Sequence, residues 1–339
     1  MPHSFSRRAF LTLASGTVIA ARSGRAAVKR TAVTIANASG NLNLTMAELM
    51  RQEKLLESVD LDPTILTVAD GTRILGGVVG GSADLSTMSG FGQVFPAIER
   101  GAGIKILAGG SLLPVLALFS AKPNVRILKD LEGKTVGTGS IGALIYQLTA
   151  NLLEKYGVDL SKVRFANIGS STDIFRAVAA GTVDAGAGDV TLIDSAAEHH
   201  VHLIEHGNMS IELKEYTYQG AWASDQKIAA ERDTLVRALA AYGKLYRLVQ
   251  NPESKEAFFR ARLSAFSNAP MSDHQALWNY IQTYKPFAVN LALSPERLQF
   301  MQMLNVGFKV QKEILPFQRV ADMSLAADAV KLMDGGTLK

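Results

Sequence analysis

Two segments of this chain, 100 residues apart, share one pattern of apolar, glycine and acidic positions. The first spans 72–86 and reads TRILGGVVGGSADLS, and the second spans 172–189 and reads TDIFRAVAAGTVDAGAGD. In each, a helical run ends at a glycine, which favours the left-handed conformation after the last turn, and an apolar strand follows. The coinciding positions are Thr72/Thr172, Ile74/Ile174, Val78/Val178, Gly81/Gly181 and Asp84/Asp184.

A spacing this long is too great for a solenoid repeat. It predicts two similar α/β lobes, each containing the same helix–glycine–strand step. A chance match between two common helix-to-strand joints is the alternative. The chain has 339 residues, which is enough for two domains with substantial cores.

The charge of the chain is concentrated at its N-terminus. Lys and Arg number 35 against 31 Asp and Glu, but residues 1–26 contain four arginines and no acidic residue. Without that segment the chain is formally neutral, so we expect neither a nucleic-acid-binding surface nor a membrane-surface helix. Cysteine is absent, which excludes disulfides, thiol catalysis and cysteine metal sites.

Residues 1–26 have the pattern of an export signal. Ser6-Arg7-Arg8-Ala9-Phe10-Leu11 is close to the twin-arginine motif, and the apolar run 9–21 is too short to span a bilayer. Small residues surround an expected cleavage site after Ala26. A retained membrane anchor is the alternative. We therefore predict an exported protein that is soluble in the periplasm.

The chain beyond Arg30 alternates between strand and helix patterns. Strands are expected over 32–39, 63–68, 83–88 and 104–109, with helical periodicity between them and a helix opening at 89–92. This order is typical of a parallel, doubly wound sheet. A second set of strands is expected over 135–139, 163–168, the second copy of the repeat and 202–204, with a helix over 140–156.

Two segments are expected to connect the lobes. Residues 113–122 form an irregular strand that leaves the first lobe, and the alternating segment 216–224 returns to it. We therefore predict lobe one over 27–117 and 220–339, and lobe two over 118–219. The remainder is expected to be helical over 226–250, 252–263, 273–283, 294–315 and 324–333, with prolines at helix starts.

The segment Asp130–Ser140, DLEGKTVGTGS, together with the export signal and the paired repeat, resembles the periplasmic solute-binding proteins of ABC importers. The subgroup it is most similar to serves nitrate, alkanesulfonates, taurine and thiamine-precursor pyrimidines. The resemblance covers residues 31 to about 225 well. It implies an α/β, type II periplasmic-binding-protein fold with doubly wound, mostly parallel lobes and a helical C-terminal region. It also implies a monomer that delivers a small-molecule ligand to a membrane permease driven by an ATPase.

Six loops at the carboxyl ends of expected strands are the candidate ligand contacts, because ligands of parallel α/β sheets bind there. They span 37–41, 89–92, 109–112, 137–141, 169–173 and 186–191, and are rich in Gly, Ser, Thr and Asn. The aromatic residues Phe91 and Trp222 are added as stacking candidates. The full set is Asn37, Ser39, Gly40, Asn41, Ser89, Gly90, Phe91, Ser111, Thr138, Gly139, Ser140, Ser170, Ser171, Thr172, Asp189 and Trp222.

Each candidate has a structural alternative. Ser140 and Ser170–Thr172 suit anion binding at helix N-termini, but the same residues serve as N-caps without a ligand. Phe91 and Trp222 suit stacking or core packing equally. None of the six loops contains Lys, Arg or His, so an anion would be held by dipoles and hydroxyls. A neutral or aromatic ligand fits about as well, and Asp173 or Asp189 would accept hydrogen bonds from an amine or amidine.

Metal binding, catalysis and sensing are the alternatives to ligand transport. The histidines at 199, 200, 202 and 206 lack a recognised metal-ligand spacing, so no metal or other cofactor is expected. The resembling fold also occurs in desulfinases and pyrimidine-pathway enzymes, so an enzyme acting on a small aromatic or pyrimidine compound is the alternative function. A sensor domain would need a signalling partner or membrane span that this sequence lacks. A binding protein without chemistry of its own is the leading hypothesis.

Overall fold

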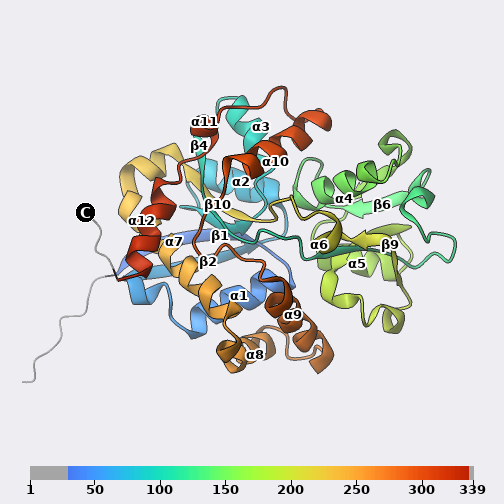
Figure 1. The fold of residues 1–339 in the computed structure, drawn as a ribbon, viewed down its shortest axis with the longest axis horizontal. Helices are drawn as coiled ribbons and strands as arrows, with labels where there is room; N and C mark the ends of the chain where they lie inside the picture. The colour runs from blue at the N-terminus through green and yellow to red at the C-terminus, as the bar shows by residue number, and fades with distance from the viewer. Residues whose placement is uncertain (1–29, 336–339) are drawn as a thin grey trace, which may run out of the picture.

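The structure is a computed structural model that describes residues 30–335. The predicted export signal, with its twin-arginine motif and cleavage site, lies outside the described residues. Two groups of strands, each flanked by helices, form the two ends of the molecule (Figure 1). Among residues 30–335, no helix has the length and apolar character needed to cross a membrane.

The first group of strands has the order β2-β1-β3-β10-β4. Strand β1 (Thr31–Ala38) pairs in parallel with β2 (Leu61–Val68) and is joined to β3 (Ser86–Ser89) by a parallel bridge between Ile35 and Leu85. Strand β10 (Gly220–Ser224) runs antiparallel between β3 and β4 (Ile104–Gly109). We call this group the first sheet.

The second sheet repeats that arrangement with the order β7-β6-β8-β5-β9. Strands β6 (Thr135–Thr138), β7 (Arg164–Asn167) and β8 (Ala185–Asp189) are parallel. Strand β5 (Leu116–Ser120) lies antiparallel between β8 and β9 (His202–Asn208). In both sheets the fourth strand is therefore the antiparallel one. In the first sheet this strand is β10, which the chain reaches after completing the second sheet. In the second sheet it is β5, which follows β4 of the first sheet in the chain.

The helices cover both sheets and build the C-terminal region (Figure 1). Around the sheets lie α1 (Asn41–Gln52), α2 (Gly71–Val79), α3 (Val94–Glu99), α4 (Leu144–Lys155), α5 (Ser171–Ala179) and α6 (Met209–Glu212). The C-terminal region comprises α7 (Asp225–Gln250), α8 (Lys255–Ala265), α9 (Met271–Tyr284), α10 (Pro295–Gly307), α11 (Phe317–Val320) and α12 (Ser324–Met333).

Three expected helix boundaries were wrong. The helix expected from position 140 begins at Leu144, because Gly142 has a φ of 81° and Ala143 is extended. The helix expected over 294–315 ends at Gly307, and the left-handed Lys309 follows it. The helix expected to open at 89–92 begins only at Val94. At the first two of these boundaries, residues with extended or left-handed backbone displace the helix start or end.

The repeat seen in the sequence has the same geometry in both sheets. Gly81 and Gly181 follow the C-caps of α2 and α5 with φ angles of 76° and 71°. Asp84 exchanges two hydrogen bonds with Thr34 on β1: its N–H donates to the Thr34 carbonyl at 2.8 Å, and its carboxylate accepts from the Thr34 N–H at 2.7 Å. Asp184 makes the same pair with Thr135 on β6, at 2.9 and 2.8 Å.

Helix α7 fastens the C-terminal region to the first sheet. Its inward face buries Leu235, Leu239, Tyr242 and Tyr246. The Tyr242 hydroxyl accepts a hydrogen bond of 2.9 Å from the Asn37 side chain at the end of β1. This contact holds the C-terminal region against the first sheet near the carboxyl end of β1.

Candidate functional site

A small cavity of about 50 Å³ lies where the loops of the two sheets meet. From the first sheet it is lined by the loops after β1, β2 and β3 and by the segment entering β10, and from the second by the loops after β6 and β7. A volume of this size holds one or two water molecules. The lining residues are Ala38, Ser39, Ala69, Asp70, Gly71, Ser89, Gly90, Gln93, Gly139, Ala143, Leu144, Ile145, Gly169, Ser170, Ser171, Tyr218 and Gln219.

Asp70 connects the two sides of this cavity. It is the N-cap of α2, and its Oδ1 accepts hydrogen bonds from the N–H groups of Thr72 at 2.8 Å and Arg73 at 3.3 Å. Its second oxygen, Oδ2, accepts a hydrogen bond from the Ser140 hydroxyl in the loop after β6. Burial tends to raise the pKa of Asp70, but these hydrogen bonds outweigh burial and lower the pKa.

Ser170 occupies the corresponding place in the second copy of the repeat, 100 residues on. It is the N-cap of α5, where its hydroxyl accepts from the Asp173 N–H at 3.2 Å and bonds the Asp173 carboxylate at 2.6 Å. The preceding Gly169 has a φ of 119°, which explains the glycine at this sharp turn. Ser170 therefore caps α5, as the structural alternative for this residue expects.

Three polar side chains at the cavity have atoms without a hydrogen-bond partner among residues 30–335. These atoms are Ser39 Oγ, Gln93 Oε1 and Gln219 Oε1. Gln219 is 1% exposed and Gln93 is 9% exposed. A buried polar atom without a partner costs free energy, typically about 1–3 kcal/mol. Such atoms beside a cavity indicate that a ligand or water completes their hydrogen bonding.

A buried network of polar side chains links α4, beside the second sheet, to α10 in the C-terminal region. Gln147 on α4 is 1% exposed and donates to the Asn305 side chain on α10, while its Oε1 accepts from the Tyr216 hydroxyl at 2.9 Å. Asn305 in turn donates to the Gly92 carbonyl at 2.7 Å. Gly92 and Gly90 permit this close approach, because an added Cβ would lie within 3 Å of the side chains of Gln147 and Leu144 respectively.

Six of the predicted site residues line the cavity: Ser39, Ser89, Gly90, Gly139, Ser170 and Ser171. Three others lie beside it. Ser140 bonds Asp70, Gly40 lies opposite the Ser171 hydroxyl, and Thr172 follows Ser171 in the first turn of α5. The remaining predicted residues are outside the cavity lining: Asn37, Asn41, Phe91, Ser111, Thr138, Asp189 and Trp222.

The polar residues in that last set are engaged within the fold. Asn37 accepts from the Thr87 and Met88 N–H groups and donates to Tyr242. The hydroxyls of Ser111 and Thr138 donate to the carbonyls of Leu113 and Gly139. Asn41 begins α1, and its carbonyl accepts from the Thr45 hydroxyl.

Asp189 and the two aromatic candidates are buried. Asp189 caps the short turn after β8 by accepting from the N–H and hydroxyl of Thr191. Burial raises its pKa, although the bonds from Thr191 act in the opposite direction. Phe91 packs edge-to-face against Phe95, and Trp222 donates its indole N–H to Ser89 Oγ at 3.2 Å. For both aromatics the structure supports the core-packing alternative.

The sequence analysis missed Asp70, Gln93, Tyr218 and Gln219, which all line the cavity. The repeat contained a signal for Asp70, because extending the alignment back from Thr72/Thr172 by two residues pairs Asp70 with Ser170. Gln93 and Gln219 had no such signal, since each lies in a segment predicted to be helix or strand. Their side chains reach the cavity because of how the chain folds around it.

The histidine-rich segment forms contacts of another kind. The His202 ring lies 2.7 Å from the Val125 carbonyl, and His206 stacks on Tyr156 and lies 3.2 Å from Glu212. In the part of the chain that the structure describes, no three His, Cys, Asp or Glu side chains are grouped so as to hold a metal ion.

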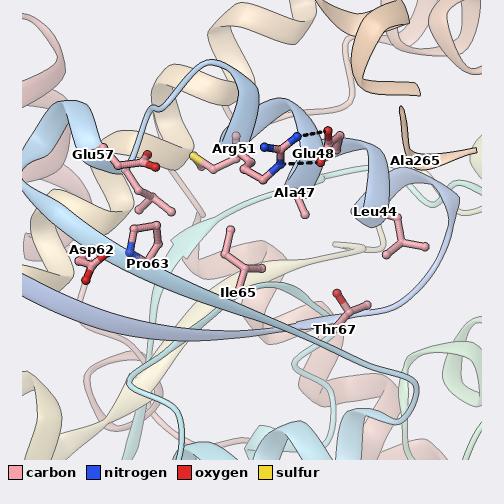
Figure 2. Close-up of a pocket in the computed structure, with 12 residues that line it drawn as sticks. Leu44, Ala47, Glu48, Arg51, Glu57, Asp62, Pro63, Ile65, Thr67 and Ala265 are labelled. Atoms are coloured by element: carbon pink, nitrogen blue, oxygen red, sulfur yellow. Dashed lines mark hydrogen bonds and ion pairs between the residues drawn. The ribbon is translucent and has the colours of Figure 1, made fainter. Parts of the chain in front are cut away.

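A larger surface pocket of about 480 Å³ lies between α1 and the outer edge of β2 (Figure 2). Leu44, Ala47 and Ile65 form its apolar wall. Glu48 and Arg51 form an ion pair of 2.6 Å on its rim, and the hydrogen bond from Arg51 lowers the pKa of Glu48 to about 2. The second sheet contributes no residue to the lining of this pocket, and the charges of Glu48 and Arg51 pair with each other. The smaller cavity, with unpartnered polar atoms and walls from both sheets, is therefore the candidate binding site.

Comparison with protein-family models places this chain in a family. A scan of protein-family models matches residues 56–255, more than half of the chain, to the model described as NMT1/THI5 like. The chain belongs to the NMT1/THI5-like family. No curated protein matches it in a sequence search.

Solved structures similar to this NMT1/THI5-like chain share its fold at low identity. The alkanesulfonate-binding protein SsuA of Xanthomonas axonopodis pv. citri, bound to MOPS, is 19% identical with a TM-score of 0.68, over 89% of this chain and 99% of that one. The nitrate-binding protein NrtA of Synechocystis PCC 6803 is 10% identical with a TM-score of 0.72, over 90% of each chain. The desulfurization enzyme DSZB is 12% identical with a TM-score of 0.59, over 89% of this chain and 99% of that one.

Proposed function

We propose that this protein is the solute-binding component of an ABC uptake transporter. It captures a small organic or oxyanionic ligand, such as a sulfonate, a nitrate-like anion or a pyrimidine or other aromatic compound, and delivers it to a membrane permease coupled to an ATPase. It acts as a monomer in the periplasm after removal of residues 1–26. Membership of the family and the likeness in fold to SsuA and NrtA support this proposal.

The single observation that carries the proposal is the buried cavity between the sheets, whose walls come from both and whose Gln93 and Gln219 side chains lack partners. A ligand seated there would contact both sheets at once. We propose that the sheets belong to two lobes, 27–117 with 220–339 and 118–219, joined by the segments that contain β5 and β10.

The mechanism that follows is hinge closure. A cavity of about 50 Å³ is far smaller than the several hundred Å³ of most small-molecule sites, so entry of an organic ligand requires the lobes to separate. Contacts to both lobes exist only when the lobes are together. The ligand therefore binds the closed state more tightly and shifts the population toward it.

The test begins with native mass spectrometry of residues 27–339 purified from the periplasm. The emptied protein is then screened by thermal shift against sulfonates, nitrate, bicarbonate, pyrimidines and aromatic acids. A compound that raises the melting temperature with the logarithm of its concentration supports a binding protein. A protein that carries no small molecule and responds to none of the panel contradicts the proposal.

An enzyme on the same fold is the second candidate, because DSZB shares the architecture. The chain contains no cysteine, and the Ser140 hydroxyl at the cavity is bonded to a carboxylate, with no histidine in the cavity lining. This arrangement provides no imidazole base for a serine nucleophile. Recovery of the bound compound unchanged after prolonged incubation favours the transporter, and its conversion favours the enzyme.

A further inference from the structure

The two copies of the repeat differ at the residue that begins each cavity-facing helix. At this position α2 has a carboxylate, Asp70, and α5 has a hydroxyl, Ser170. Asp70 is the one charged residue in the cavity lining, considering residues 30–335. The cavity therefore contains a fixed negative charge and no cationic side chain to compensate it. This charge opposes a bound anion and favours a group that donates hydrogen bonds.

The Gln93 amide also favours a ligand that donates hydrogen bonds, because its orientation is fixed by its neighbours. Its Nε2 donates to the carbonyls of Gly90 at 3.0 Å and Gly71 at 3.3 Å. A rotated amide would bring its oxygen against these two carbonyl oxygens, so Oε1 must be the atom left without a partner. An amide oxygen only accepts hydrogen bonds. Gln93 therefore requires a donor from whatever occupies the cavity.

The remaining polar groups adapt to either kind of ligand. The Ser39 hydroxyl donates or accepts, and the Gln219 amide offers its oxygen or its nitrogen according to how it turns. The helix N-termini of α1 and α5 add backbone N–H donors near the place where Gly40 and Ser171 lie close together. Selectivity between donors and acceptors therefore rests on Asp70 and Gln93.

We propose that Asp70 and Gln93 select a ligand that presents N–H donors, of the amidine, amine or amide type, and disfavour oxyanions that have none. This inference rests on the proposed function and specifies its ligand. A bound N–H group takes the place of the Ser140 hydroxyl at Asp70 Oδ2 and completes the hydrogen bonding of Gln93 Oε1. Nitrate and simple sulfonates supply no hydrogen for either oxygen.

The experiment compares two planar isosteres of opposite hydrogen-bonding character, acetamidinium and acetate, with nitrate and methanesulfonate as further anions. Binding to the emptied chain 27–339 is measured by thermal shift and titration calorimetry at matched ionic strength. The variant is Asp70→Asn, which keeps an N-cap residue and removes the charge. Asp62→Asn is the matched control, because Asp62 is exposed and lines the larger pocket beside β2.

Acetamidinium is expected to raise the melting temperature of the wild type and of Asp62→Asn. Its affinity for Asp70→Asn is expected to fall roughly tenfold or more, the typical effect of losing a charge-assisted hydrogen bond. Anions that bind the wild type as well as acetamidinium does would overturn the inference and leave the proposed function standing. Absence of binding by all four probes would also overturn it, and the function would then be decided by whether a small molecule is released from the protein on unfolding.

Discussion

The two copies of the repeat hold the same backbone geometry with different surroundings. Asp84 and Asp184 close the same pair of hydrogen bonds, to Thr34 on β1 and to Thr135 on β6 respectively. Asp84 also forms an ion pair of 2.7 Å with Lys227 on α7. Asp184 lies just before β8 in the second sheet, which α7 does not cover. The carboxylate therefore has a structural role in both sheets, and the C-terminal region reinforces only the first.

The copies also differ two residues after the aspartate, where the first copy has Ser86 and the second has Gly186. Ser86 in β3 has room for its side chain, which bonds the Ser89 hydroxyl at 2.5 Å. At the equivalent place in β8, a Cβ on Gly186 would lie 2.4 Å from Ile174 and 3.1 Å from Val178. Helix α5 therefore packs closely against its sheet at a point where the first sheet accommodates a hydroxymethyl group.

The largest effect is expected from Gly186→Ala. The added methyl group forces the stiff, branched Ile174 side chain aside and is expected to destabilise the protein by about 1–3 kcal/mol. Ser86→Ala, the matched change in the first copy, should cost about 1 kcal/mol through loss of one hydroxyl hydrogen bond. Urea unfolding measures both. Equal costs would show that the two copies are packed alike and contradict the comparison.

Replacing the repeated aspartates tests their shared role. Asp84→Ala and Asp184→Ala each remove the acceptor of a strand N–H, which is expected to cost about 2 kcal/mol. Asp84→Ala should cost somewhat more, because Lys227 then retains only Glu231 as a partner at 2.9 Å. Unfolding curves at low and high salt separate the two variants. A salt-dependent difference is expected for Asp84 alone, and the same salt response in both would contradict this assignment.

Gly90→Ala tests the contact between the lobes. Its Cβ would lie 2.6 Å from Leu144 Cβ, so the variant should hold the lobes apart and weaken ligand affinity roughly tenfold. The melting temperature without ligand should change little, because the clash relaxes when the lobes separate. Adding Leu144→Ala makes room for the methyl group and should restore much of the affinity. A double variant as weak as Gly90→Ala would show that closure is not the step affected.

The smallest effect concerns pH. The pKa of Asp70 is lowered in the folded protein, so its contribution to stability is complete above the ordinary value of 3.8 and is lost as pH falls through the lower folded value. Because Asp70 is only partly buried, the contribution should stay below about 1 kcal/mol. The wild type should lose this advantage over Asp70→Asn below about pH 4 in thermal unfolding.

Most of the fold was predictable from the chain, since the paired repeat and the strand–helix alternation are local patterns. The α/β class and the strand β4 were confirmed, and the helix over 324–333 matches α12. Boundaries failed where local backbone departs from periodicity, as at Gly142 and Lys309. Pattern gives the type of an element more reliably than its ends.

The site was less predictable than the fold. The loops at strand ends include Ser39, Gly90 and Ser170, which line one cavity because a parallel sheet places those loops together. Composition did not reveal that the side chains of Asn37 and Asp189 are used internally, or that Gln93 and Gln219 extend into the cavity. Those outcomes depend on neighbours brought together only by the tertiary fold.

The central claim, that a ligand draws the two lobes together, is tested most directly by a distance measurement between them. The absence of cysteine allows Arg73→Cys on α2 and Arg176→Cys on α5, both exposed, to be labelled specifically with spin labels. Double electron–electron resonance should show a longer, broader distance distribution in the emptied protein and a shorter, narrower one with the co-purified ligand restored. An identical distribution in both states, with the ligand demonstrably bound, would contradict hinge closure.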